Sequence, residues 1–293
     1  MKFNEFVDYI VDNITDYLMR DDIEKIEVQK TRKNNNCIFT GMLIFLKDNN
    51  LQPNIYLEPF YNDYKSGKDL DDILQAMASD FNQALNNMIT VSEDILSEEQ
   101  IKRKCFLKLV NYKKNEEELE HAPYIPFHDL AITFWCLVDD EGNSISSFMI
   151  NQKHMDLWDI SIEELYCYAK KNTTELFPML FTRLDKMLSG IVNVDNMTKE
   201  IEMYILTNRQ NINGSIYMTY KKVMEDVSEQ IGANMFIIPS SINEVLILPD
   251  KGNIDKKYIE GLVKDVNENV VSPLEFLSNT VYYYDCKTKM IEI

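Results

Sequence analysis

Residues 203–249 read MYILTNRQNINGSIYMTYKKVMEDVSEQIGANMFIIPSSINEVLILP, and they carry the densest structural signals in the chain. The run 203–206 is apolar and of strand length, and the asparagines that follow it, with Gly214, tolerate the positive φ of a tight turn. Between 221 and 231 apolar residues recur at three- and four-residue spacing, which predicts a helix with one buried face, closed by Gly232. Residues 235–238 and 245–248 predict two buried strands.

The hexapeptide PSSINE, residues 239–244, joins those two strands and is the one predicted turn between buried strands that is rich in hydroxyls and amides. Five of its six residues, with two from the preceding turn, are the candidate binding residues: Asn208, Gly214, Pro239, Ser240, Ser241, Asn243 and Glu244. A serine nucleophile needs an activating base, yet no GxSxG motif surrounds Ser240 and Ser241, and no histidine has a triad context. We therefore assign no catalytic residue. The competing interpretation is a structural turn whose hydroxyls cap strand ends.

Length and charge set limits on the class of protein. A chain of 293 residues exceeds what one core usually organises, and 45% hydrophobic residues suffice to fill more than one. The net charge is −18, with 15 basic and 27 acidic groups in residues 1–150 and 15 and 21 in the remainder. Such acidity opposes direct binding of nucleic acid or of a membrane, because both need a basic footprint. It favours a basic protein partner, or imitation of nucleic acid.

Cysteine and histidine usage indicates neither a disulfide framework nor a metal. The five cysteines are far apart and form no CxxC pair, so we expect buried free thiols in a reducing cytoplasm and no cofactor. His121 and His128 lie near Glu120 and Asp129, but this loose spacing across two prolines is more typical of surface loops than of metal ligands. The N-terminus lacks a signal-peptide core, and no apolar run is long enough to span a membrane.

Three modules are predicted, at 1–95, 96–195 and 196–293, with residues 193–199 as a linker. The first has the order α-β-β-β-α, with a helix from Phe3, strands at 26–30, 38–46 and 54–60, and a helix capped by Asp69. Mixed helices and hairpins in all three modules favour the α+β class, with mostly antiparallel sheets and packed helices.

The second and third modules also carry clear local signals. Ser97 and Ser161 begin capping boxes, and 130–138 with 145–150 predict a hairpin around a central strand. A helix over 255–267 is expected to turn Ile259, Leu262, Val263 and Val266 inward, before closing strands at 280–285 and 290–293. Consecutive tyrosines at 282, 283 and 284 cannot share one face of a strand, so at least one must be exposed or covered by other structure.

Several segments carry a resemblance to a known family. They are IYLEP (55–59), LVN (109–111), DLA (129–131), LTN (206–208) with NG (213–214), and PSSINEVL (239–246). With these the chain resembles, over essentially its whole length, the bacterial family catalogued as domain of unknown function 5688. The resemblance implies an origin in Gram-positive gut bacteria, often on a mobile element, with no established activity. Members commonly carry histidine where this chain has Asn243, which argues against imidazole chemistry at the turn.

Two functional classes follow from the sequence. The favoured one is a non-enzymatic interaction or regulatory protein that presents an acidic surface to a basic protein, with mimicry of nucleic acid against a host defence factor as its sharper form. The alternative is a hydrolase or small-ligand-binding enzyme centred on the turn from Pro239 to Glu244.

Overall fold

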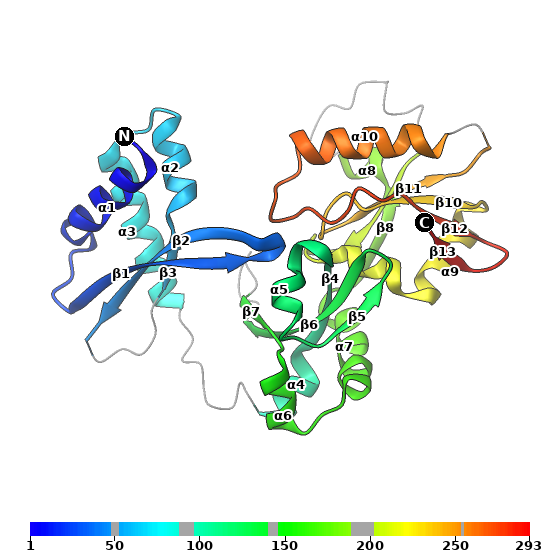
Figure 1. Cartoon of the computed structure of the whole chain (residues 1–293), viewed down its shortest axis with the longest axis horizontal. Coiled ribbons are helices and arrows are strands. Elements are labelled where there is room, and N and C mark those ends of the chain that lie inside the picture. Colours follow the sequence, from blue (N-terminus) through cyan, green and yellow to red (C-terminus); the bar gives the residue numbers. More distant parts are fainter. Residues whose placement is uncertain (48–52, 88–96, 140–145, 189–201, 253–254) are drawn as a thin grey trace. The chain divides into compact units, whose positions relative to one another are not determined.

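The computed structural model describes residues 1–47, 53–87, 97–139, 146–188, 202–252 and 255–293. The chain divides into two compact units, Met1–Ser92 and Glu93–Ile293. The predicted module boundaries at 95/96 and 195/196, and the predicted linker 193–199, lie outside the described residues. Helices and antiparallel sheets are mixed in both units, which confirms the α+β class (Figure 1).

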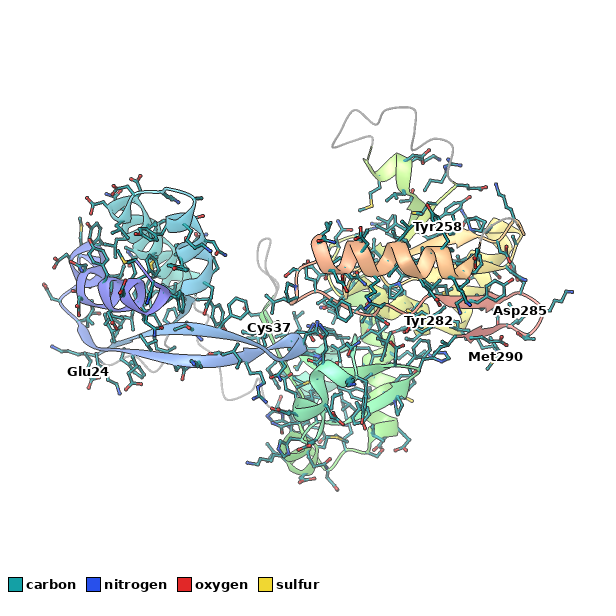
Figure 2. The ribbon with its side chains drawn as sticks, turned by 45° about the horizontal axis from the view of Figure 1, so that its top comes forward. Glu24, Cys37, Tyr258, Tyr282, Asp285 and Met290 are labelled. Atoms are coloured by element: carbon teal, nitrogen blue, oxygen red, sulfur yellow. The ribbon has the colours of Figure 1, made fainter. Side chains whose placement is uncertain are left out.

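The N-terminal unit packs helices on one face of the sheet β1-β2-β3. Its elements are α1 (Phe3–Leu18), β1 (Ile23–Lys33), the turn η1 (Asn34–Asn36), β2 (Cys37–Leu46), β3 (Asn54–Tyr56), α2 (Leu57–Lys65) and α3 (Leu70–Asn87). The core consists of apolar side chains one helical turn apart on α1 and α3, packed against alternate residues of β2: Phe6, Ile10, Ile14, Ile73, Met77, Phe81, Met42 and Ile44. Glu24 and Cys37 mark the two ends of the β1–β2 hairpin (Figure 2).

The predicted strand 54–60 is wrong beyond Tyr56, because the chain begins α2 at Leu57. Pro59 falls in the first turn of that helix, where a missing N–H breaks no helical hydrogen bond. Glu58 Oε1 accepts a hydrogen bond from the Thr40 N–H at 2.6 Å, so a side chain continues the pairing of β2 where β3 ends. The described residues of this unit therefore form one more helix than the predicted order α-β-β-β-α.

The C-terminal unit begins with a four-stranded sheet in which β6 is central. Its elements are α4 (Glu98–Lys104), β4 (Cys105–Asn111), η3 (Lys113–Asn115), α5 (Glu116–Leu119), β5 (Tyr124–Phe127), β6 (Leu130–Asp139), β7 (Ser146–Met149), α6 (Gln152–Trp158) and α7 (Ile162–Leu176). As predicted, β6 and β7 pair, and the hydroxyls of Ser97 and Ser161 cap α4 and α7.

A six-stranded sheet of order β13-β12-β10-β11-β9-β8 completes the unit. Its elements are β8 (Met179–Arg183), α8 (Leu184–Leu188), β9 (Tyr204–Asn208), η5 (Gly214–Thr219), α9 (Lys221–Ile231), β10 (Met235–Ile238), β11 (Val245–Pro249), α10 (Lys256–Asn269), β12 (Tyr282–Asp285) and β13 (Met290–Glu292). β8 was not predicted, because its residues carry only a weak apolar pattern. Gly232 adopts φ 75° after α9, as predicted for a helix-closing glycine.

The three tyrosines of β12 show that the six-stranded sheet is covered on both faces. Tyr282 and Tyr284 are buried in the main hydrophobic cluster of the C-terminal unit. This cluster also contains side chains of the four-stranded sheet, α7, η5 and α9. Tyr283 points to the opposite face, against Phe236 with ring centroids 5.2 Å apart, beside the smaller cluster under α10. This confirms that the tyrosines divide between faces. In the described part of the chain no helix has the length and apolar character needed to cross a bilayer.

Candidate functional site

The PSSINE turn is a closed network of hydrogen bonds. The Ser241 hydroxyl donates to Glu244 Oε1 at 2.8 Å and accepts from the Asn243 N–H at 3.0 Å. The Asn243 amide is also occupied, since Oδ1 accepts from the Asn213 N–H and Nδ2 donates to Glu275 Oε1. Pro239 is buried. These side chains satisfy one another, which is what a structural turn requires.

Asn208 and Gly214 close the same corner from the preceding turn. The Asn208 side chain is buried, donates to the Ile212 carbonyl at 2.6 Å, and accepts from the N–H groups of Gln210 and Ile212. The Gly214 N–H donates to the Asn243 carbonyl at 3.0 Å. A Cβ at Gly214 would lie 2.6 Å from both that carbonyl oxygen and Thr207 Oγ1, so this position has no room for a side chain.

Ser240 is the candidate binding residue that points elsewhere. Its hydroxyl makes no hydrogen bond to any residue that the structure describes, and it lines a cavity between α10 and the six-stranded sheet. The structure therefore brings Asn208, Gly214, Ser241, Asn243 and Glu244 together in one corner and separates Ser240 from them. The free serine faces an apolar space.

That cavity, called here the α10 trough, has a volume of about 620 Å³. On the sheet side it is lined by the last residue of β10, by two alternate residues of β11 and by the residue before β9, namely Ile238, Leu246, Leu248 and Met203. On the helix side it is lined by two neighbouring rows of α10, namely Tyr258, Ile259, Leu262, Val263 and Val266. The polar lining residues are Ser240, Asp255 and Asn267.

The two rows of α10 differ in exposure, which corrects the prediction that its apolar residues all face inward. Ile259 and Val263 are buried against the sheet, whereas Leu262 is 49% and Val266 46% exposed. Tyr258, one turn earlier in the same row, is 66% exposed and is labelled in Figure 2. Sequence reasoning missed this row as a surface, although apolar residues in two adjacent rows make a stripe wider than one helix needs for packing.

Histidine and metal chemistry find no support at the trough. None of its lining residues is a histidine. His154 Nδ1 accepts from the Asn151 N–H at 3.2 Å, and burial lowers the pKa of its ring. Over the ranges that the structure describes, no three His, Cys, Asp or Glu side chains are grouped to hold a metal ion.

Asp129, considered above as a metal ligand, is instead surrounded by hydroxyl donors. Its carboxylate accepts from Ser278 Oγ at 2.5 Å, from Thr280 Oγ1 at 3.2 Å and from the Tyr282 hydroxyl. Burial and the hydrogen bond to Asp129 raise the pKa of Tyr282. These contacts hold the turn before β6 against the segment that enters β12.

The model of the family described as "Family of unknown function (DUF5688)" matches residues 3–286, which confirms the resemblance seen in the sequence. No curated protein and no solved structure gives a significant match.

Proposed function

The chain belongs to this family of unknown function, and we propose that its C-terminal unit is a binding module that holds an elongated, uncharged or cationic apolar ligand in the α10 trough. The observation that carries this proposal is the combination of a cavity of about 620 Å³ with a helix row left half exposed at its mouth. Ligand sites are commonly concave and apolar, with volumes of roughly 300–1,000 Å³. Well-packed protein interiors, in contrast, leave few voids larger than a water molecule.

The lining supports an elongated ligand. Asp255, the N-cap residue of α10, and Asn267, within that helix, both border the trough and are twelve residues apart, which corresponds to about 18 Å at 1.5 Å per residue. Buried Ile238, Leu248 and Val263 form the inner part, and Leu262 and Val266 form the rim. A ligand lying along α10 would remove both rim side chains from water, with a gain of about 25 cal/mol per Å² of apolar surface.

The polar lining residues limit the charge of the ligand. Among the described lining residues Asp255 alone is charged, and its Oδ1 caps α10 by accepting from the Lys257 N–H at 3.0 Å. Its negative charge would repel a carboxylate or phosphate on the ligand. Ser240 supplies a free hydroxyl, which suits a ligand with an apolar body and one uncharged hydrogen-bonding group.

Catalysis is not part of this proposal. Ser240 has no histidine among its neighbours on the trough lining, and the remaining side chains of the turn are engaged with one another. A serine hydroxyl without a base is a weak nucleophile at neutral pH. Binding is therefore the activity that this arrangement supports best.

The test uses an uncharged fluorescent probe, N-phenyl-1-naphthylamine, titrated with the full chain. We expect saturable fluorescence enhancement, and at least about a tenfold loss of affinity in Leu262→Asp, because a carboxylate would enter the apolar mouth. The matched control is Leu157→Asp on α6, because Leu157 is 68% exposed and outside the trough. Equal probe affinity in both variants and in the wild type would show that the probe does not bind in the trough, and would contradict the proposal.

Competition by straight-chain compounds measures ligand length and charge. For primary alcohols that displace the probe, affinity should rise about fourfold per added CH₂, because burying each one contributes ~0.8 kcal/mol. This increase should stop when the alcohol is longer than the trough. At equal length an alkanoate should bind more weakly than the alcohol, and Asp255→Asn should narrow that difference while asparagine preserves the helix cap. Absence of length dependence would contradict an elongated site.

A second function, docking of a basic partner, has its own support in the N-terminal unit. Helix α1 exposes Glu5, Asp8, Asp12 and Asp16, and it contains no lysine or arginine. No described cation pairs with Asp8, Asp12 or Asp16, which are four residues apart along one side of the helix. Like charges at this spacing destabilise a helix by about 0.2–0.5 kcal/mol per pair. This acidic row fits a basic protein, and mimicry of nucleic acid is the narrower form of the same proposal.

This second function is tested with a labelled arginine-rich peptide, by fluorescence anisotropy at low and high salt. Asp8→Asn/Asp12→Asn/Asp16→Asn should weaken binding at low salt, and the difference should vanish at high salt because exposed charges are screened. The control changes three exposed acids of the other unit, Asp156→Asn/Glu163→Gln/Glu229→Gln, with the same change in net charge. Equal weakening in both triple variants would show that net charge alone drives binding.

A further inference from the structure

Two of the five cysteines face each other in the first sheet of the C-terminal unit. All five are free; Cys105 and Cys136 are buried as predicted, whereas Cys167 is exposed and the other two are half-buried. In the antiparallel ladder between β4 and β6, Cys105 lies directly opposite Cys136. Only the tertiary structure brings these two cysteines together, because thirty residues separate them in the sequence.

The hydrogen bonds around this pair identify its type. The Cys105 N–H donates to the Ile101 carbonyl, and the Leu107 N–H donates to Thr173 Oγ1, so neither group points toward β6. On the other strand, the Phe134 carbonyl accepts from the Ile150 N–H rather than from β4. Cys105 and Cys136 therefore form a non-hydrogen-bonded pair, the kind whose Cα atoms lie about 4.5 Å apart with the side chains closest.

That spacing falls in the range found for disulfides, roughly 4.4–6.8 Å between Cα atoms. Opposite residues of an antiparallel pair point to the same face, and both thiols belong to the main hydrophobic cluster. Asn172 Nδ2 lies 3.5 Å from Cys105 Sγ and donates to the Cys105 carbonyl at 3.0 Å, which fixes the strand beside α7. The register and the shared face thus place the two sulfurs side by side.

We propose that Cys105 and Cys136 are a cross-strand dithiol that a small peroxide converts to a disulfide, locking the edge strand β4 to the central strand β6. One cysteine thiolate attacks a peroxide oxygen, the O–O bond breaks, and the sulfur becomes a sulfenic acid as hydroxide leaves and takes up a proton. The second sulfur then attacks the first, the S–S bond forms, and water leaves. Two thiols give up two electrons and two protons, and hydrogen peroxide becomes two waters.

Burial makes this reaction slow in the closed protein. Burial and the neighbouring Cys136 raise the pKa of Cys105 to about 12, and burial raises the pKa of Cys136 to about 11. The thiolate is the reactive form, so the oxidation rate should rise about tenfold per pH unit between pH 7 and 9. β4 is an edge strand, and its transient opening would admit the oxidant. Once formed, the disulfide is enclosed by the cluster and protected from large reductants.

The experiment uses the full chain with the other cysteines replaced, Cys37→Ser/Cys167→Ser/Cys286→Ser. After hydrogen peroxide in a low urea concentration, the protein is unfolded, alkylated with N-ethylmaleimide and weighed. We expect a mass 2 Da below the reduced chain, no alkylation, and a linked peptide containing both cysteines. The melting temperature should rise by several degrees, because the bond closes a loop of about thirty residues in the unfolded chain.

The same chain carrying Cys136→Ala is the control, and it should keep one alkylatable thiol or gain only oxygen. Two alkylated thiols after oxidation, in urea that does expose them to N-ethylmaleimide in the reduced protein, would overturn the proposal. A disulfide that lowers the melting temperature would also overturn it, because the native register would then not accommodate the bond.

Discussion

The PSSINE corner and the α10 trough meet at Ser240, yet they are built on opposite principles. In the corner, Ser241, Asn243 and Glu244 use their hydrogen-bonding groups on one another and on the chain beside them. In the trough, Leu262 and Val266 remain half exposed above a cavity of about 620 Å³. A turn rich in polar groups can thus be wholly structural. The surface that a ligand would stabilise by burial is the apolar one, in the trough.

The largest effect expected from this comparison is in the corner, at Gly214→Ala. The new Cβ would meet the Asn243 carbonyl and Thr207 Oγ1 at 2.6 Å, which should destabilise the C-terminal unit by about 3 kcal/mol. Urea unfolding followed by tyrosine and tryptophan fluorescence measures this. The control is Gly261→Ala in α10, where nothing lies within 4 Å and alanine should stabilise the helix by about 0.5–1 kcal/mol. Similar effects of the two alanines would contradict the packing described for the corner.

Asn208→Ala is expected to cost about 2 kcal/mol. It leaves the Gln210 and Ile212 N–H groups and the Ile212 carbonyl without their partner at a nearly fully buried position. Probe binding in the trough should be unchanged in the folded variant, because Asn208 does not line it. A selective loss of probe affinity with unchanged stability would make the corner a binding site after all.

The two serines of the turn give the sharpest paired test. Ser241→Ala should destabilise the unit by about 1 kcal/mol, because it removes hydrogen bonds to Glu244 and from Asn243. Ser240→Ala should leave stability within about 0.5 kcal/mol and weaken an alcohol ligand a few-fold, since its hydroxyl is free in the trough. Thermal unfolding and probe competition are both needed. Reversed roles for the two serines would contradict the assignment of Ser241 to the hydrogen-bonded corner and of Ser240 to the trough.

The smallest effect lies in the N-terminal unit, where Asp12→Asn should stabilise by about 0.4–1 kcal/mol. The substitution removes the middle charge of the row Asp8, Asp12 and Asp16. It therefore removes two repulsive pairs, Asp8 with Asp12 and Asp12 with Asp16. The gain should shrink at high salt, as urea unfolding in 50 and 500 mM NaCl would show. A loss of stability would indicate that Asp12 has a favourable partner and is not an unpaired member of an acidic row.

Local signals in the sequence located most elements of the fold. Ser161 begins α7 with a capping box, and Gly232 ends α9 in the left-handed region, because each signal depends on groups within one helical turn. The failures occurred where local signals conflict or are weak. The strand was predicted over 54–60, but α2 begins at Leu57. Pro59 gives no signal against this helix, because a proline is tolerated in a first helical turn. β8 has little pattern of its own and depends on its register with β9.

The candidate site was predictable only in part. The sequence placed Ser240 in the turn between β10 and β11, but its neighbours Ser241 and Asn243 looked equally available. Their hydrogen bonds reach Glu275 and Asn213, and no local rule predicts such partners. For α10, periodicity identified Ile259, Leu262, Val263 and Val266 as apolar without telling which row meets the sheet. The choice of row depends on packing against Phe236, Ile238 and Leu248 of the sheet, which no local pattern in α10 indicates.

The amino-acid sequence by itself determined the α+β class, the helix caps, the central hairpin and the division of three tyrosines between two faces of one strand, because these follow from backbone periodicity and short-range hydrogen bonds. Only the tertiary structure decided that Leu262 and Val266 border an open trough, that Ser240 is free while Ser241 is not, and that Cys105 faces Cys136. The physical reason is that exposure and cross-strand register depend on contacts between residues far apart in the chain.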